Sequence, residues 1–316
     1  LGLCLLMKQS GILLLGAYGV CGLLAGPPRG ATWGAVFRRD MPAGLAACAA
    51  AIVVGYGVTG LPWFVEGWAV FQRLGGKGSV LNYLNGEFSL NGWWHYYAYA
   101  LLVKTPPPML ALLAGYGWLF IRRPFDRGRS DILLLAPALV FFLTLSLGKV
   151  QVGLRYLMPA WPFLCVLAGT AAVRFLAWRS SFAKPALAAG LLWCGVELAR
   201  VFPYYSAYFN DIAGGSEHGW QVMHEIEWPL DMGALRRYVA SAGAREVVVA
   251  GYDMAYNRPR FDRYAAADFA GSTAAVPGEK VLLVITSSHL KSITVARKDW
   301  YAWLWKYPPA ARIAYS

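Results

Sequence analysis

Long apolar stretches alternate with short polar ones through the first two-thirds of the chain. A membrane-spanning helix needs about 20 mainly apolar residues. Stretches that approach this length are Leu1–Leu24, Pro42–Gly60, Trp94–Phe120, Ile132–Leu147, Pro159–Ala177 and Pro185–Val201. We therefore expect a mainly α-helical polytopic membrane protein of about six spans.

The third apolar stretch is interrupted by Lys104 and by three consecutive prolines, Pro106–Pro108. Proline removes a backbone donor and clashes with the preceding turn, so the helix should break here. Unpaired backbone groups are costly in hydrocarbon, so the break should be buried in protein or face water. We expect an outer amphipathic piece over Gly92–Val103 and an inward helix from about Thr105.

The pattern changes after Val201, where short β-branched runs replace the long apolar stretches. Two of these runs, Val247–Ala250 and Val281–Ile285, predict buried strands. We also expect helices over Asp231–Ala242 (N-cap Asp231) and Trp300–Trp305, and a strand over Arg312–Tyr315. The chain is thus expected to have two domains: a transmembrane helical region over 1–201, and a small extracytoplasmic α/β domain over 202–316.

The composition excludes the possibility that the whole chain is a water-soluble enzyme. Hydrophobic residues make up 58% and charged residues 15%, whereas soluble domains carry roughly a quarter charged residues. The formal net charge is +12, but residues 1–201 hold 17 basic and 6 acidic residues, and residues 202–316 hold 12 and 11. A nucleic-acid-binding protein would place its basic patch on the water-soluble part. Nucleic acid is therefore not an expected partner.

Basic side chains gather in alternate loops between the apolar stretches. These loops carry Arg29, Arg38 and Arg39; then Arg122, Arg123, Arg127 and Arg129; then Arg174, Arg179 and Lys184. The positive-inside rule puts such loops in the cytoplasm. We therefore expect a multi-pass protein of the cytoplasmic (inner) membrane, with the other connections and the C-terminal domain on the outer side.

The chain begins at Leu1, inside an apolar stretch and without a charged leader. We therefore expect it to be a piece of a longer protein. Its five cysteines all lie in apolar stretches, with no spacing typical of a zinc site or a disulfide framework. The sequence predicts no metal-ligating residues.

Three basic residues, Lys104, Lys149 and Arg155, are expected at the outer ends of the spans. Charges at this depth are costly and mark binding sites, and the matching ligand is a phosphate. Ordinary snorkelling to the headgroups is the alternative interpretation. Glu87 and His95 bracket a group of aromatic residues on the same side and are weak candidates for an acid or base.

Several strings follow one another along the chain. They are Leu5–Lys8, Asn85–Ser89, Gly92–Tyr97, Leu102–Pro106, Gly153–Pro159 with Pro162, and Tyr208–Asn210 with Ala213–Gly215 and Gly219–Trp220. In their order along the chain and in the side of the membrane on which they are expected, these strings resemble segments of polytopic glycosyltransferases of the GT-C class. More narrowly, they look like bacterial relatives of protein O-mannosyltransferases and lipid A aminoarabinose transferases.

The resemblance implies transfer of a sugar from a polyprenyl-phosphate donor to an acceptor on the outer membrane face, with inversion at the anomeric carbon. It implies that Arg155 and Lys104 clamp the lipid phosphate and that Tyr156, Trp93 and Trp94 line the sugar vestibule. The acceptor is left open between a protein, lipid A or lipopolysaccharide, and another glycan or lipid. Participation of a divalent cation is left open as well.

The chain departs from the family in two ways. The family's catalytic acidic motif lies in the first outer loop, which should precede Leu1, so no residue here takes that role by resemblance. The segment Glu225–Pro229 replaces most of an Asn-x-Asp-Trp-Gly-like pattern. Two other classes remain open: a transporter or flippase of an anionic lipid, in which broken helices also occur, and a membrane scaffold without catalytic activity.

Overall fold

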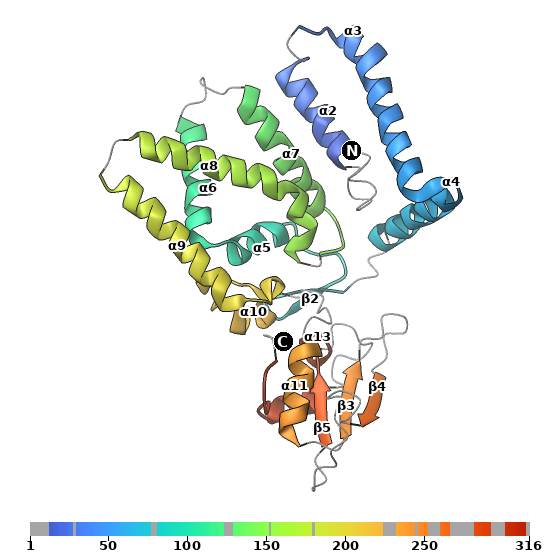
Figure 1. Cartoon of the computed structure of the whole chain (residues 1–316), viewed down its shortest axis with the longest axis vertical. Coiled ribbons are helices and arrows are strands. Elements are labelled where there is room, and N and C mark those ends of the chain that lie inside the picture. Colours follow the sequence, from blue (N-terminus) through green and yellow to red (C-terminus); the bar gives the residue numbers. More distant parts are fainter. Residues whose placement is uncertain are drawn as a thin grey trace. The chain divides into compact units, whose positions relative to one another are not determined.

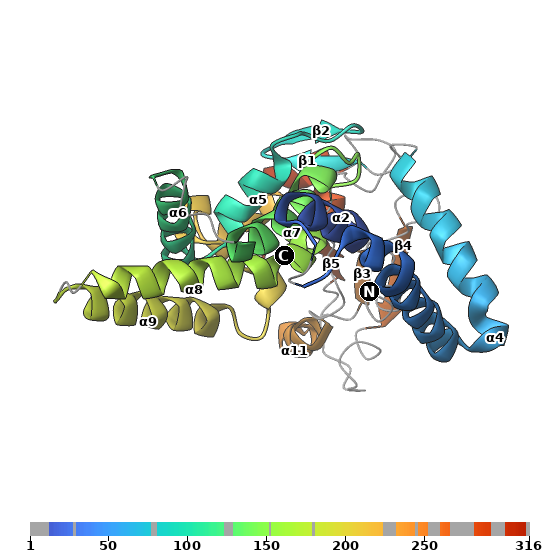
Figure 2. The ribbon, with the colours of Figure 1, turned by 90° about the horizontal axis from the view of Figure 1, so that it is seen from above.

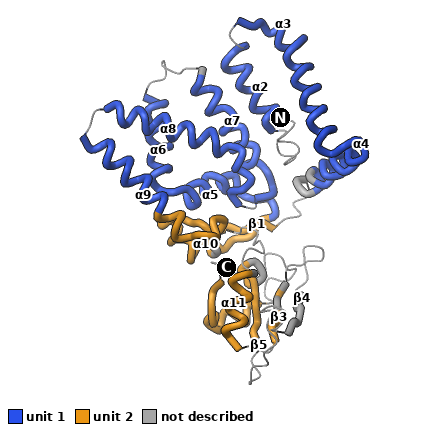
Figure 3. The backbone as a smooth tube through the Cα atoms, viewed as in Figure 1, with its two compact units in different colours: residues 1–80, 90–195 blue, residues 81–89, 196–316 orange. Residues whose placement is uncertain are grey.

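The computed structural model describes residues 13–27, 30–76, 81–122, 129–151, 153–178, 181–223, 232–243, 246–251, 260–265, 281–291 and 301–313. The chain is mainly α-helical, as predicted. It divides into two compact units, which are described separately (Figure 3). Unit 1 comprises residues 1–80 and 90–195, and unit 2 comprises residues 81–89 and 196–316.

Unit 1 is built from helices. They are α2 (Leu13–Ala25), α3 (Trp33–Ala35), the π-helical η2 (Val36–Asp40), α4 (Met41–Gly76), α5 (Tyr96–Lys104), α6 (Pro107–Arg122), α7 (Arg129–Ser146), the 3-10 helix η4 (Leu154–Ala160), α8 (Trp161–Ala177) and most of α9 (Ala183–Val201). Helix α8 packs on α6 and α7, and α2 packs on α7 (Figures 1 and 2). Tyr116, Leu167 and Ala171 form a buried cluster between α6 and α8.

The expected number of spans is not supported. In the described part of the chain, two helical stretches are long and apolar enough to cross a membrane, Trp33–Val70 and Leu154–Ala177. Two shorter apolar helices, Leu13–Ala25 and Ser130–Ser146, accompany them. The remaining candidates fall short for physical reasons: the proline break leaves α6 with 16 residues, and charged residues lie within α9.

Many large apolar side chains on these helices are exposed. The apolar window of Trp33–Val70 has no buried residue, and Val54 and Leu191 are 85% and 74% exposed. Water-soluble monomers rarely expose large contiguous apolar surfaces. The two helical stretches of membrane-spanning length thus carry exposed apolar side chains.

The second predicted span lies in α4, which consists of two helices that meet at a kink. The sequence predicted a span over Pro42–Gly60 followed by a connection from Leu61, and after the kink a second helix runs through Pro62 to Gly76. Gly57, with φ 68° and ψ 165°, is the non-helical point of α4 and kinks it. Glycine adopts this backbone conformation without the steric cost that a Cβ would add. The first of the two helices therefore ends near the predicted end of the span, and the missed feature is the second helix in the segment that was predicted as a connection.

The predicted helix break at the prolines is confirmed. Helix α5 ends at Lys104, Thr105 is extended, and α6 begins at Pro107. The residue before a proline is pushed out of the helical region, which explains why the break falls at Thr105. Figures 1 and 2 show α5 running across the direction of α6. As a result, α5 is separate from the apolar helix that follows it.

Unit 2 combines a hairpin, short helices and a small sheet. Its elements are β1 (Asn82–Leu84), β2 (Glu87–Ser89), the end of α9, the 3-10 helices η5 (Tyr205–Ala207) and η6 (Asp211–Ala213), α10 (Ser216–Val222), α11 (Met232–Ala242), β3 (Glu246–Gly251), β4 (Arg260–Ala265), β5 (Val281–Ile285), α13 (Ser287–Leu290) and the 3-10 helix η8 (Ala302–Lys306). Strands β1 and β2 pair antiparallel. The sheet has the order β4-β3-β5, with β3 antiparallel to β4 and parallel to β5.

The two predicted strands of this unit are confirmed as β3 and β5, and the helix predicted over Asp231–Ala242 is confirmed as α11. The helix predicted over Trp300–Trp305 corresponds to the 3-10 helix η8, Ala302–Lys306. Leu235 and Val239 of α11 pack on Val247 of β3, so the predicted apolar faces form the core. Strand β4 was missed because its sequence, Arg-Phe-Asp-Arg-Tyr-Ala, is rich in charge. The predicted N-cap Asp231, Trp300 and residues 314–316 lie outside the described residues, and Arg312–Ile313 is not a strand.

Candidate functional site

Two loops of unit 1 are joined by the side chain of Gln151. This residue is 1% exposed and lies in the connection between α7 and η4. Its Oε1 accepts a hydrogen bond from the backbone N–H of Trp93 at 2.8 Å, and its Nε2 donates to the Trp93 carbonyl at 2.7 Å. Nε2 also lies 3.4 Å from the Gly148 carbonyl oxygen. The amide therefore fixes the segment before α5 to the segment before η4.

Glycines make this close approach feasible. Gly92 has φ 70°, and a Cβ on it would lie 2.6 Å from Gln151 Oε1. Gly153 has φ 80° and precedes η4 directly. Both positions need a residue that tolerates positive φ, and Gly92 also needs the space that a missing side chain leaves.

A second contact joins the same two segments. Tyr96, at the start of α5, is fully buried, and its hydroxyl accepts a hydrogen bond from the Gly153 N–H at 2.9 Å. The rings of Tyr96 and Tyr97 pack edge to face, with centroids 5.2 Å apart. Helix α5 also packs on η4. The start of α5 thus holds in place the 3-10 helix that carries Arg155 and Tyr156.

Arg155 is half-buried and lies against the neighbouring aromatic ring. Its Cζ is 5.3 Å from the ring centroid of Tyr156, within the range of a cation–π contact. Its charge also acts on the hydroxyl of Tyr97. Burial raises the pKa of Tyr97 above its ordinary value, the phenols of Tyr96 and Tyr156 raise it further, and the Arg155 charge lowers it. The Tyr97 hydroxyl therefore keeps its proton at physiological pH.

Lys104 lies on the same buried face of α5. This face comprises Tyr96, Tyr97, Ala100, Val103 and Lys104, and Lys104 is 8% exposed. Tyr97 and Lys104 are two helical turns apart, about 10 Å along the axis. Lys104 thus shares the buried face of α5 with Tyr97, on whose hydroxyl the Arg155 charge acts.

The other predicted residues differ in position and exposure. Lys149 is exposed in the turn after α7, and Trp93 is half-buried beside the Gln151 contact. Trp94 is strongly exposed, and its ring lies edge-on to that of His95, with centroids 5.4 Å apart. Glu87 is exposed on β2 and belongs to unit 2, whereas His95 belongs to unit 1.

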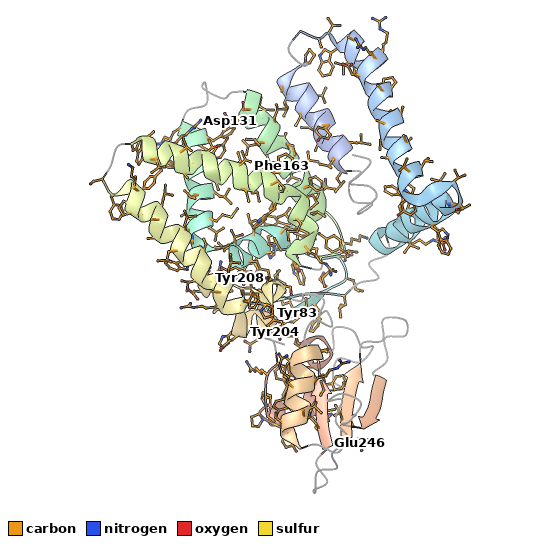
Figure 4. All side chains as sticks on the ribbon, in the orientation of Figure 1. Tyr83, Asp131, Phe163, Tyr204, Tyr208 and Glu246 are labelled. Carbon is orange, nitrogen blue, oxygen red and sulfur yellow. The ribbon has the colours of Figure 1, made fainter. Side chains whose placement is uncertain are left out.

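The C-terminal part of α6 and the start of α7 form contacts of another kind, away from Lys104. The Tyr116 hydroxyl donates to Asp131 Oδ1 at 2.6 Å, and Arg122 Cζ lies 4.3 Å from the Trp118 ring centroid (Figure 4, where Asp131 is labelled). Because α6 begins beside the break and ends at Arg122, these residues lie a helix length away from Lys104. Over the described ranges, no group of three His, Cys, Asp or Glu side chains is placed to hold a metal ion.

The string from Tyr208 to Trp220 has a structural explanation in unit 2. The Tyr208 hydroxyl donates to Glu197, which is 5% exposed near the end of α9 (Figure 4). Ser216 Oγ accepts from the Phe209 N–H at 3.1 Å. A Cβ on Gly219 would overlap the Phe209 ring. These residues therefore form a tight turn between α9 and α10.

The hairpin of unit 2 is tied to the end of α10. The Tyr83 hydroxyl donates to the Gln221 carbonyl at 2.9 Å, and the Asn85 N–H donates to the Val222 carbonyl at 2.8 Å. Lys291 Nζ lies 4.3 Å from the Tyr83 ring centroid. Segments that are far apart in the sequence thus meet in one unit.

Sequence reasoning missed Gln151 and treated Tyr97 only as a member of a group of aromatic residues. A polar amide flanked by two valines, in a connection with a glycine on either side, was the available signal for Gln151. Comparison of the chain with known protein families, with curated proteins and with solved structures finds no match. The arrangement is therefore interpreted from its own chemistry.

Proposed function

We propose that the chain belongs to a membrane glycosyltransferase that moves a sugar from a polyprenyl-phosphate donor to an acceptor. The acceptor would be a protein, lipid A or lipopolysaccharide, or another glycan, on the outer face of the cytoplasmic membrane. The observation that carries the proposal is that Lys104 lies on the buried face of α5 beside a helix break, and that the charge of Arg155 acts on Tyr97 of the same face.

The chemistry of sugar transfer suits these residues. Cleavage of the donor leaves negative charge on the lipid phosphate, and fixed cations at that position stabilise the transition state. The planar guanidinium of Arg155 matches two phosphate oxygens, and the ammonium of Lys104 supplies a point charge. The contacts of Gln151 and Tyr96 hold the Arg155 segment in place before the ligand arrives, so little reorganisation is needed.

A lipid-linked donor is supported by the exposed apolar surface of unit 1 and by its two long apolar helices. The basic residue at the other end of α6, Arg122, fits a cytoplasmic position under the positive-inside rule. Within this chain, Glu87 and His95 are the weak candidates for the acid or base of the reaction.

A second candidate function is transport of an anionic lipid across the membrane. The break between α5 and α6 favours it, because discontinuous helices that point at charged groups are typical of transporters. In that case Lys104 and Arg155 would bind the same phosphate without any bond being broken. The two candidates differ in whether labelled sugar leaves the lipid.

The test uses the full-length protein in membranes and a radiolabelled polyprenyl-phosphate sugar. We expect Arg155→Ala to lower transfer to the acceptor fraction by about 100-fold or more, and Lys104→Gln to weaken apparent donor affinity. Arg122→Ala removes an exposed arginine at the other end of α6 and is the matched control. Normal transfer by Arg155→Ala would contradict the proposal, and lipid translocation in vesicles without sugar transfer would favour the transporter.

A further inference from the structure

The hydroxyl of Tyr97 is buried without a partner. The side chain is 0% exposed, and within the described part of the chain no atom forms a hydrogen bond with its oxygen. The adjacent Tyr96 is equally buried, yet its oxygen accepts from the Gly153 N–H. An unsatisfied buried hydroxyl costs about 1–3 kcal/mol. The Tyr97 hydroxyl therefore does not contribute to the stability of the ligand-free protein, and this points to a role in ligand binding.

The surroundings of this hydroxyl indicate what it binds. Arg155, which acts on it electrostatically, offers only donors, and the Tyr97 phenol is neutral and has a proton to donate. The Tyr97 hydroxyl therefore lacks a hydrogen-bond acceptor. An acceptor that binds beside a guanidinium is most favourably an anion. Among the described residues of unit 1, the acidic ones are Asp40, Glu66 and Asp131. Asp131 is bonded to Tyr116 at the far end of α6, and the other two lie on η2 and α4.

We infer that Tyr97 donates a hydrogen bond to the same phosphate that Arg155 and Lys104 bind, and that it is a positioning residue for the lipid-linked donor. This inference rests on the proposed function for the identity of the anion. Lys104 shares the buried face of α5 with Tyr97, and Arg155 on η4 acts electrostatically on the Tyr97 hydroxyl, so the two cations attract the phosphate and the phenol fixes its orientation. Hydrogen bonds to charged acceptors are roughly twice as strong as neutral ones, so the phosphate satisfies the hydroxyl fully.

The test is Tyr97→Phe in the full-length protein, purified in detergent. The probe is a polyprenyl monophosphate, and its affinity is measured by calorimetry together with thermal unfolding of the ligand-free protein. Because the variant removes a buried group without a partner, the unfolding temperature should be unchanged or higher. The affinity should fall about 10-fold, the value expected for one hydrogen bond to a charged group. A 4-aminophenylalanine at position 97 retains a donor and should restore most of the affinity.

Tyr116→Phe is the matched control. It removes a tyrosine hydroxyl that has a partner, so it should lower the unfolding temperature and leave the affinity unchanged. The corresponding polyprenol, which lacks the phosphate, should bind equally to the parent protein and to Tyr97→Phe. Inorganic phosphate as a competitor separates recognition of the headgroup alone from recognition that needs the lipid.

The outcomes distinguish this inference from the proposed function. Unchanged affinity in Tyr97→Phe, with Arg155→Ala weakened, would overturn the role of Tyr97 and leave the phosphate site intact. Unchanged affinity in both variants would overturn the phosphate site itself. A lower unfolding temperature of Tyr97→Phe with unchanged affinity would assign Tyr97 a purely structural role.

Discussion

The side-chain amide of Gln151 forms both hydrogen bonds with the backbone of Trp93, at 2.8 Å and 2.7 Å. This is the pairing that a neighbouring strand would offer to one peptide unit, supplied here by a side chain 58 positions away in the sequence. Because Gln151 is buried, water cannot take the place of either hydrogen bond when it is lost. Together with the contact between Tyr96 and Gly153, this residue fixes the relative position of the segments before α5 and η4.

Gln151→Glu should destabilise unit 1 and lower sugar transfer. The carboxylate can still accept from the Trp93 N–H, but it has no proton for the Trp93 carbonyl and adds a buried charge. We expect a loss of about 2–4 kcal/mol in the free energy of unfolding, measured by thermal and denaturant unfolding in detergent. Gln72→Glu makes the same change at an exposed position on α4 and should have little effect. Equal stability of the two variants would refute the role of Gln151.

Gly92→Ala should produce a similar defect from the other side of the same contact. The added Cβ would lie 2.6 Å from Gln151 Oε1, at a φ of 70°. We expect a loss of about 1–3 kcal/mol, and less than additive loss in combination with Gln151→Ala because both act on one contact. Gly115→Ala, inside α6 with no atom within 4 Å of its Cβ position, should instead stabilise by about 0.5–1 kcal/mol.

Tyr208→Phe should loosen unit 2 around the end of α9. It removes the hydroxyl that donates to the buried carboxylate of Glu197, and a buried charge that loses a donor costs about 1–3 kcal/mol. The measurement is the rate of limited proteolysis within unit 2, alongside thermal unfolding. Tyr205→Phe, which changes an exposed tyrosine nearby, should behave like the parent protein. Identical proteolysis of both variants would show that the Tyr208 contact is dispensable.

Tyr83 should make the stability of unit 2 decrease at high pH. Burial raises the pKa of Tyr83, while its contact with the Gly86 backbone lowers it. Above about pH 10, an unfolded tyrosine loses its proton, whereas the folded protein retains it, so stability falls as pH rises toward the folded pKa. Below about pH 10 this group should have no effect on the pH dependence. Tyr83→Phe should flatten the decline in urea unfolding between about pH 10 and 11.5; a decline as steep as in the parent protein would exclude Tyr83 as its source.

Local patterns were enough to predict several elements of the fold. The prolines after Lys104 predicted the helix break, and β-branched runs predicted β3 and β5, because each signal is contained within a few residues. The hairpin signal was also present: Asn85 and Gly86 have φ 47° and 90°, as two-residue hairpin turns require. It was missed because the whole segment was assigned to a connection between spans.

The remaining features depend on contacts that no local pattern records. The partner of Gln151 is Trp93, far away in the sequence, so no local motif around Gln151 marks the contact. Tyr97 and Tyr96 are adjacent residues of the same type, and only the position of Gly153 distinguishes the bonded hydroxyl from the unbonded one. The number of spans was overestimated because a stretch broken by prolines and a stretch that contains charged residues were each counted as a span.

The assignment of residues 81–89 to unit 2 has a consequence for biosynthesis. The ribosome completes Tyr83 long before it makes Gln221, and α5 to α9 must be synthesised in between. The nascent hairpin therefore has to wait, incompletely packed, until the residues that complete its fold have been synthesised. A recombinant polypeptide that starts at Val196 would never receive this hairpin, so supplying residues 81–89 as a separate peptide should be needed to recover its native packing.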